Sequence, residues 1–275
     1  MKPTSGHLVP TLALVFLTLF VLLAVFAQLL SPYDMVAMDL RARLAPPVFL
    51  GGDWAHPLGT DHLGRDVLTR LLHSLQMTTA IALVGTVIGA IVGTLAGLVS
   101  AHLGGVVDDA IMLLVDTQAA IPFIIIALGA IALFGNSVLL FFVVVGLSGW
   151  EGYARIARGL TMQAKSLGYV TAVRLMGGGS ARVYLRHVLP NIASALIVNL
   201  TLNFPSTILL ESSLSFVGVG IQPPLTSLGS MLGYGRDYLF TEWWLAVFPG
   251  ALIFAVALCI SILGDALRDR LAGNQ

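Results

Sequence analysis

Long runs of apolar residues, separated by shorter polar stretches, make up most of the chain. The first run, residues 8–30, contains no charged residue and is long enough to cross the ~30 Å hydrocarbon core of a bilayer. Five further runs of similar length follow. The pattern predicts an all-α integral membrane protein with about six transmembrane helices, at residues 8–30, 78–101, 109–133, 137–157, 188–216 and 245–267.

The first apolar run is interpreted as a retained helix and not as a cleaved signal peptide. It is longer than the apolar core of a signal peptide, and no small-residue cleavage site closes it. We therefore expect two parts in the chain. Residues 1–76 hold the first helix and a long outer loop, and residues 77–275 hold the other five helices.

Composition supports a membrane protein and excludes several other classes. Charged residues make up 10% of the chain, against about 25% in a typical soluble domain. The formal net charge is zero, which argues against a nucleic-acid partner because phosphate binding needs a basic surplus. No catalytic constellation is found: residues 159–166 lack the second glycine of a phosphate-binding loop, and the six histidines show no metal-ligand spacing.

The distribution of lysine and arginine predicts the orientation of the helices. With the N-terminus inside, nine of the 14 basic residues fall in inner segments and five in outer ones. Most of the outer ones lie in the long loop 31–76, and long loops cross the membrane with little regard to charge. Both termini are therefore expected on the cytoplasmic side.

A glycine recurs at every fourth position of the second predicted helix. Such spacing places small residues along one face of a helix, where they let two backbones approach closely in lipid. The helix is predicted to pack tightly on another helix, in this chain or in another subunit. The four glycines are Gly85, Gly89, Gly93 and Gly97.

Two acidic residues, Asp116 and Glu211, lie within predicted spans. A charge at that depth costs at least ~2.5 kcal/mol unless it meets a partner or water. Glu211 shares one side of the fifth helix with Asn199 and Asn203. This polar stripe either faces a translocation path or forms hydrogen bonds that hold the bundle together, and for Glu211 we favour the path.

The inner segment 158–187 predicts a cytoplasmic elbow. Ser166 can cap a short helix that the three glycines at 177–179 end, and Ser180 can cap a second helix that runs to Pro190. The elbow carries several arginines, which could anchor it at the membrane surface. Its apolar residues are too many for a solvated loop, so a docking surface for a cytoplasmic subunit is the sharper interpretation.

Four sequence motifs carry a resemblance to a known family. The stretch YVTAVRLMG at 169–177, followed by LRHVLPN at 185–191, resembles the EAA loop of ABC importer permeases. Three more segments resemble the C-type permease of dipeptide, oligopeptide and nickel importers. They are HPLGTDHLGRD at 56–66, LSFVGVGIQPP at 214–224 and LGDALRD at 263–269.

The resemblance implies a type I importer permease whose core, residues 77–275, couples to ATPases through the elbow at 166–187. The residues expected to couple are Tyr169, Thr171, Ala172, Arg174, Gly177 and Pro190. One departure concerns the EAA glutamate, whose position is held by Thr171. The ionic contact associated with that glutamate is therefore not expected here, and apolar and backbone contacts must carry the docking.

The family also implies partners and a location. A second related permease would complete the pathway, two cytoplasmic ATPase subunits would bind ATP and Mg²⁺, and an extracytoplasmic protein would deliver the solute. The chain itself would bind no cofactor and would lie in the inner membrane of a bacterium.

Other functions remain possible at this point. Within the family, the solute could be a dipeptide, an oligopeptide or a nickel or other metal chelate. Outside it, a secondary transporter driven by an ion gradient would show inverted repeats and unwound helices in mid-membrane, neither of which is evident in the sequence. A membrane scaffold would not need the elbow.

Overall fold

The computed structural model describes residues 8–167, 173, 176 and 179–272, and every regular element in these residues is a helix. Five helices are long and apolar enough to cross a membrane, and a sixth span is present if one sharply bent pair is counted. The predicted fold class and span number are thus confirmed. The five long helices are Leu8–Val25, Val67–Leu103, Val138–Lys165, Tyr184–Phe216 and Trp244–Leu271.

The chain begins with α1 (Leu8–Val25) and the short α2 (Ala27–Leu30). An extended segment with two single-turn helices, η2 (Leu40–Ala42) and η3 (Val48–Leu50), leads to the long helix α3 (Val67–Leu103).

The start of α3 differs from the sequence prediction. The helix begins at Val67, where the side chain of Asp66 accepts a hydrogen bond from the Thr69 amide at 2.7 Å, rather than near residue 78. The division drawn after residue 76 therefore falls inside a helix. The apolar run covers only part of this helix. The helix extends further toward the N-terminus because Asp66 caps it and its first turns are buried against other parts of the protein.

The third predicted span is a broken one. It consists of α4 (Gly105–Ala120) and α5 (Phe123–Phe134), which meet at an angle of 96°. Pro122 lies at the break as the residue before α5, where its fixed φ and missing N–H suit a helix start. The span predicted over 109–133 is therefore made of two helices that meet at a sharp bend.

The fourth span is also interrupted. It contains α6 (Val138–Gly146) and α7 (Trp150–Lys165), separated by Leu147, Ser148 and Gly149. It continues to Lys165, past the predicted end at residue 157. Unwound helices are not evident in the sequence, and the interruption at residues 147–149 is a feature that the apolar pattern did not show.

The second half of the elbow starts where predicted, with α9 (Ser180–Val183). It does not end at Pro190. One π-helical turn, η4 (Tyr184–Val188), joins it without a break to α10 (Leu189–Phe216). Most of the first predicted elbow helix and the glycines at 177 and 178 lie outside the described residues.

The mixed segment after α10 contains a helix that the apolar pattern did not predict. This is α11 (Leu228–Gly235), whose first turn is closed by a capping box between Ser227 and Ser230. A short turn, η5 (Arg236–Tyr238), then leads to the last helix, α12 (Trp244–Ala272).

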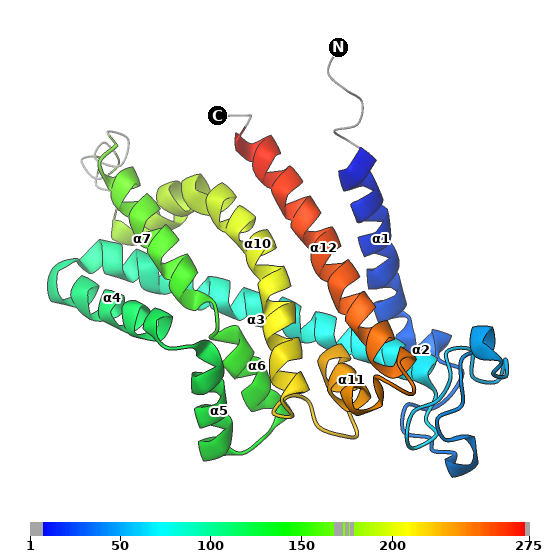
Figure 1. The fold of residues 1–275 in the computed structure, drawn as a ribbon. Helices are drawn as coiled ribbons and strands as arrows, with labels where there is room; N and C mark the ends of the chain where they lie inside the picture. Colours follow the sequence, from blue (N-terminus) through cyan, green and yellow to red (C-terminus); the bar gives the residue numbers. More distant parts are fainter. Residues whose placement is uncertain (1–7, 168–172, 174–175, 177–178, 273–275) are drawn as a thin grey trace.

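The long helices form one bundle. Figure 1 shows α1, α12 and α10 side by side, with α3 crossing them at a large angle and α11 tucked beneath α10 and α12. The first turn of α1 and the last turns of α7 and α12 lie at the upper side in Figure 1. The segment between α2 and α3 and helix α11 lie at the opposite side, so the elements alternate as a multi-pass chain requires.

The glycine face of α3 packs on α6 and α7 of the same chain, which answers the question that the sequence left open. Gly89 lies against the Gly146 carbonyl, Gly93 against the Trp150 carbonyl, and Gly97 against the Ala154 carbonyl. A Cβ atom at any of these glycines would press on backbone. The close approach of α3 to the broken fourth span therefore depends on the missing side chains.

Candidate functional site

The two helix breaks lie next to each other and are joined by one side chain. Gln118, in the last turn of α4, donates from Nε2 to the carbonyl of Leu147 at 2.7 Å and to Glu151 Oε2 at 3.1 Å. Its Oε1 accepts from the indole Nε1 of Trp150 at 2.7 Å. Because Leu147 lies in the break, its carbonyl lacks a regular helical partner, and Gln118 supplies one.

Two polar pockets flank this junction. One, of about 350 Å³, lies between the end of α4, the start of α5 and the α6–α7 break. The other, of about 270 Å³, lies between that break and α10. Ser148 and Glu151 line both pockets, so the broken backbone forms the wall between them.

Asn199 and Asn203, predicted as part of a translocation path, both line the second pocket. Asn203 lies against the backbone of the break, because a Cβ at Gly149 would meet its Nδ2 at 2.8 Å. The Nδ2 of Asn199 is buried and has no hydrogen-bond partner in the described structure. The two asparagines thus share a polar pocket, as their spacing on one face of α10 suggested.

Glu211 lies elsewhere, in a closed cluster of hydroxyl groups. Its side chain is fully buried. Ser215 donates to Oε1 at 2.8 Å, and Thr78 of α3 and Ser212 each donate to Oε2 at 3.3 Å. Such contacts are expected if Glu211 forms hydrogen bonds that hold the helix bundle together. The other interpretation, a role of Glu211 in the translocation path, stays a prediction.

The Glu211 cluster also holds the buried helix α11. The hydroxyl of Thr78 accepts from the amide of Leu228 at 3.0 Å, and Ser227 donates to Ser215 at 3.3 Å. The hydrogen bonds around this one carboxylate therefore connect α3, α10 and the first turn of α11. Buried polar groups of this kind are costly unless each has a partner.

Asp116, the other acidic residue noted in the sequence, is an exposed residue of α4. Its Oδ1 lies 2.9 Å from Nη2 of Arg155 on α7. In the described structure this aspartate therefore has the charged partner that its position in the chain required.

Glu151 and Gln118 were missed as site residues in the sequence analysis. Glu151 falls within the predicted fourth span, in the run Gly149-Trp-Glu-Gly152. Two glycines around a charged residue inside an apolar segment are typical of an interrupted helix, and that signal was available. The partnership with Gln118 had no sequence signal, because 33 residues separate the two side chains.

A buried ionic cluster around Asp61 links the segment before α3 to α3 itself and to the segment before α11. This carboxylate pairs with Arg65 at 2.8 Å and with Arg70, and Arg70 also reaches Thr226 ahead of α11 at 3.4 Å. Burial alone would raise the pKa of Asp61, but the charges of both arginines and backbone N–H donors at residues 63 and 65 outweigh it. The pKa of Asp61 therefore lies below its usual value.

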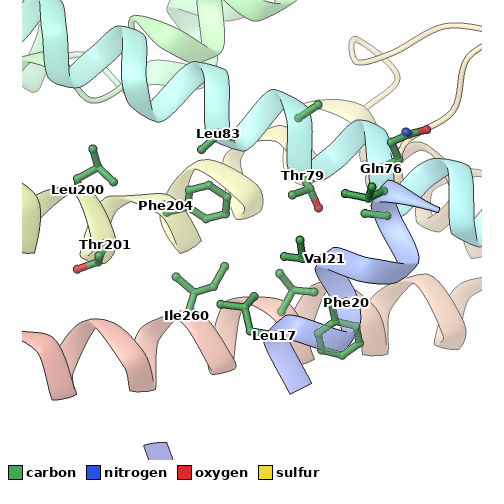
Figure 2. A pocket seen from close by; sticks show the side chains of 14 residues that line it. Leu17, Phe20, Val21, Gln76, Thr79, Leu83, Leu200, Thr201, Phe204 and Ile260 are labelled. Atoms are coloured by element: carbon green, nitrogen blue, oxygen red, sulfur yellow. The ribbon is translucent and has the colours of Figure 1, made fainter. Parts of the chain in front are cut away.

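A further cavity, of about 450 Å³, has a different character. It lies among α1, α3, α10 and α12, and Figure 2 shows apolar side chains such as Phe20, Leu83 and Phe204 around it. It offers few polar groups, so it suits hydrocarbon and not a peptide backbone. The polar pockets at the helix breaks are the better candidates for solute contact.

Of the residues predicted to couple to ATPases, Pro190 is described and lies exposed at the start of α10. The others, Tyr169, Thr171, Ala172, Arg174 and Gly177, lie outside the described residues. Within the described part of the chain, no group of three or more His, Cys, Asp or Glu side chains could hold a metal ion.

Comparison with known families identifies the class of protein. Residues 85–273 match the family described as the binding-protein-dependent transport system inner membrane component. Residues 11–47 match the N-terminal transmembrane domain of oligopeptide transport permease C. The chain belongs to this family: it is a permease subunit of an ABC importer, an integral membrane protein that works with ATPase and solute-binding partners.

Individual relatives cover almost the whole chain. It is 38% identical over 259 residues to a di/tripeptide transport system permease protein, DppC, of Pseudomonas aeruginosa. It is also 38% identical over 259 residues to the dipeptide transport system permease protein DppC of Escherichia coli. Each match covers 94% of this chain and 86% of the relative.

Solved structures support the fold. A chain of the methionine ABC transporter MetNI in an inward-facing conformation superposes with a TM-score of 0.58 at 19% identity. That superposition covers 73% of this chain and 95% of the MetNI chain. An amino acid ABC transporter solved with histidines gives a TM-score of 0.54 at 16% identity, over 73% and 93% of the two chains.

Proposed function

We propose that the chain imports short peptides, dipeptides above all, as one half of a transmembrane pathway. The observation that carries this proposal is the 38% identity to dipeptide and di/tripeptide permeases across 94% of the chain. The polar pockets beside the two helix breaks support it. They offer an acidic group, amides and a hydroxyl, which match the groups of a zwitterionic peptide.

The working complex is proposed to contain a second related permease and two ATPase subunits, with an extracytoplasmic binding protein that delivers the solute. The ATPases bind ATP and Mg²⁺ and dock on the elbow at residues 166–187. Both termini then lie in the cytoplasm of a bacterial cell, with the complex in its inner membrane. The common side of the first turn of α1 and the last turns of α7 and α12 supports this orientation.

Uptake by the reconstituted complex tests the substrate. The chain is co-purified with its partner permease and ATPases, placed in proteoliposomes and supplied with its binding protein. Radiolabelled Ala-Ala should accumulate only when ATP is enclosed on the ATPase side, and a proton or sodium gradient should not replace ATP. Uptake of a nickel chelate in place of Ala-Ala would reject the peptide proposal, and uptake driven by a gradient alone would favour a secondary transporter.

Coupling through the elbow makes a separate prediction. Replacing Gly177 by valine should remove most solute-stimulated ATP hydrolysis while the amount of complex in the membrane stays normal. The reason is that a β-branched residue resists the backbone geometry with which glycine ends a helix. ATPase activity is measured with and without loaded binding protein. Unchanged stimulation would exclude this glycine from coupling, and loss of the complex would assign it a role in assembly.

A further inference from the structure

The pocket between the α6–α7 break and α10 has the composition of a binding site for one end of a peptide. Its described lining carries one charged side chain, Glu151, together with Ser148, Asn199 and Asn203. The neighbouring pocket adds Gln118 and no further charge. A carboxylate surrounded by neutral polar groups favours a ligand that brings a positive charge and hydrogen-bonding groups.

We propose that Glu151 binds the amino-terminal ammonium of the transported peptide and that Asn199 binds the adjacent peptide carbonyl. The subsite rests on the proposed peptide-import function and specifies where this chain contacts the solute. Unlike Glu211, which is fully buried, Glu151 lines a pocket that a solute could enter.

The charges around Glu151 leave it available to a cation. Arg155 is one turn further along α7, but its guanidinium pairs with Asp116 at 2.9 Å. The side chains of Glu151, Arg155 and Asp116 together carry one net negative charge. Oε2 of Glu151 receives a hydrogen bond from the neutral amide of Gln118. A peptide ammonium would therefore be the neutralising partner that a carboxylate at this depth requires.

Asn199 supplies the second, independent observation. Asn199 lines the same pocket, and its buried Nδ2 has no hydrogen-bond partner in the described structure. A buried amide donor without an acceptor is unfavourable, and a ligand carbonyl would supply the missing acceptor. A donor beside a carboxylate is complementary to a carbonyl beside an ammonium, which is the arrangement at the start of every peptide.

The helix break makes these groups accessible. Along a continuous helix the backbone would be closed by its own hydrogen bonds, whereas here Ser148 and Gly149 interrupt it. Gln118 holds the interrupted backbone in place by accepting from Trp150 and donating to the Leu147 carbonyl. The carboxylate of Glu151 thus lies at a junction that the hydrogen bonds of Gln118 hold together.

A binding measurement on the purified permease–ATPase complex in nanodiscs, without binding protein, tests the subsite. Ala-Ala and N-acetyl-Ala-Ala are titrated, and the fluorescence of Trp150 reports occupancy because its indole is hydrogen-bonded to Gln118. A Trp150→Phe variant, in which this fluorescence change should be absent, shows that the signal comes from Trp150. The wild-type complex should bind Ala-Ala at least about tenfold more tightly than the acetylated peptide, since a charged hydrogen bond contributes ~1.5–3 kcal/mol.

Variants separate recognition from structure. Glu151→Gln should weaken Ala-Ala binding about tenfold or more and leave N-acetyl-Ala-Ala unchanged, while Glu151→Asp should keep the preference for the free amine. Asn199→Ala should weaken both peptides to the same degree. Asp237→Asn removes the acidic charge of an exposed residue of η5 that lines neither pocket, and this variant should bind both peptides as the wild type does.

Several results would overturn the subsite. They are equal binding of both peptides by the wild-type complex, an unchanged dissociation constant in Glu151→Gln, and no effect of Asn199→Ala. If Glu151→Gln does not assemble, two other measurements decide whether the subsite exists. They are the ratio of the dissociation constants of the two peptides in Glu151→Asp and the effect of Asn199→Ala on binding. Absence of saturable binding by a complex that still imports Ala-Ala rejects the subsite alone, whereas absence of Ala-Ala import rejects the proposed function.

Discussion

Replacing Gly93 by leucine is expected to abolish most of the assembled complex. A Cβ atom at this position would lie 2.6 Å from the Cβ of Tyr153 and would also press on the carbonyl of Trp150. Leucine adds three more carbons to that contact, so α3 and α7 must separate. Overpacking of this kind costs ~1–3 kcal/mol in ordinary cores, and we expect more than ~3 kcal/mol because backbone and not a side-chain tip blocks the space.

The glycine series on α3 provides an internal control. At Gly85 the nearest neighbour of an added Cβ is the side chain of Val145, at 3.0 Å, which can shift. Gly85→Ala should therefore lower the melting temperature of the complex less than Gly93→Ala. Gly129→Leu on α5, where an added Cβ meets nothing within 4 Å in this chain, should assemble normally. The measurements are complex yield by size-exclusion chromatography and thermal unfolding, and native behaviour of Gly93→Leu would contradict the packing argument.

The apolar pattern predicted which segments lie in the membrane but not how they are shaped. Hydropathy reports the average character of a segment, and both broken spans are apolar on average despite their breaks. Pro122 could be recognised as a possible bend, and the bend is there. Pro205 could be recognised in the same way, yet α10 runs through it. The difference lies in the surroundings of each proline, which the sequence does not display.

The α6–α7 break was missed for a related reason. A helix can be interrupted at membrane depth only where other groups satisfy its freed backbone. Here the amide of Gln118 does so for Leu147 from 29 residues away. Such long-range compensation cannot be read from local spacing. Asn199 and Asn203 were found from their periodicity on one helix face, whereas the local signal at Glu151, its two flanking glycines, was not used.

Helix α11 is a buried element that the hydropathy pattern did not predict. Its sequence mixes glycine, serine and apolar residues, so it does not resemble a membrane span. It is nevertheless largely buried, because α10, α12 and α3 enclose it and the capping box satisfies its first amides. Burial in protein needs fewer apolar residues than burial in lipid, since neighbouring hydroxyls can pair with polar groups.

Substitution of Glu211 by alanine is the second change expected to have a large effect. The fully buried carboxylate accepts hydrogen bonds from three hydroxyl groups, those of Thr78, Ser212 and Ser215. Alanine would leave these hydroxyls without their acceptor and would open a cavity. The two effects together predict a loss of about 3–5 kcal/mol, seen as a lower yield and a lower melting temperature of the complex.

Glu211→Gln distinguishes packing from a charge-based role in the path. Glutamine keeps the shape and one acceptor oxygen, and the hydroxyl groups can rotate to accept from its amide. If packing is the role of Glu211, this variant should assemble and transport far better than Glu211→Ala. Normal assembly and stability with strongly reduced uptake in Glu211→Gln would instead support the path. Ser213→Ala, an exposed neighbour on α10, serves as the matched control.

A double-mutant cycle completes the Glu211 test. Thr78→Val keeps the shape of the side chain but removes the hydroxyl that links Glu211 to the amide of Leu228. Because the two side chains are in contact, the stability losses of Thr78→Val and Glu211→Gln should not add, and a coupling of about 0.5–3 kcal/mol is expected. Strict additivity would show that the hydroxyl and the carboxylate act independently, and the role of Glu211 in holding α11 against α3 would then be rejected.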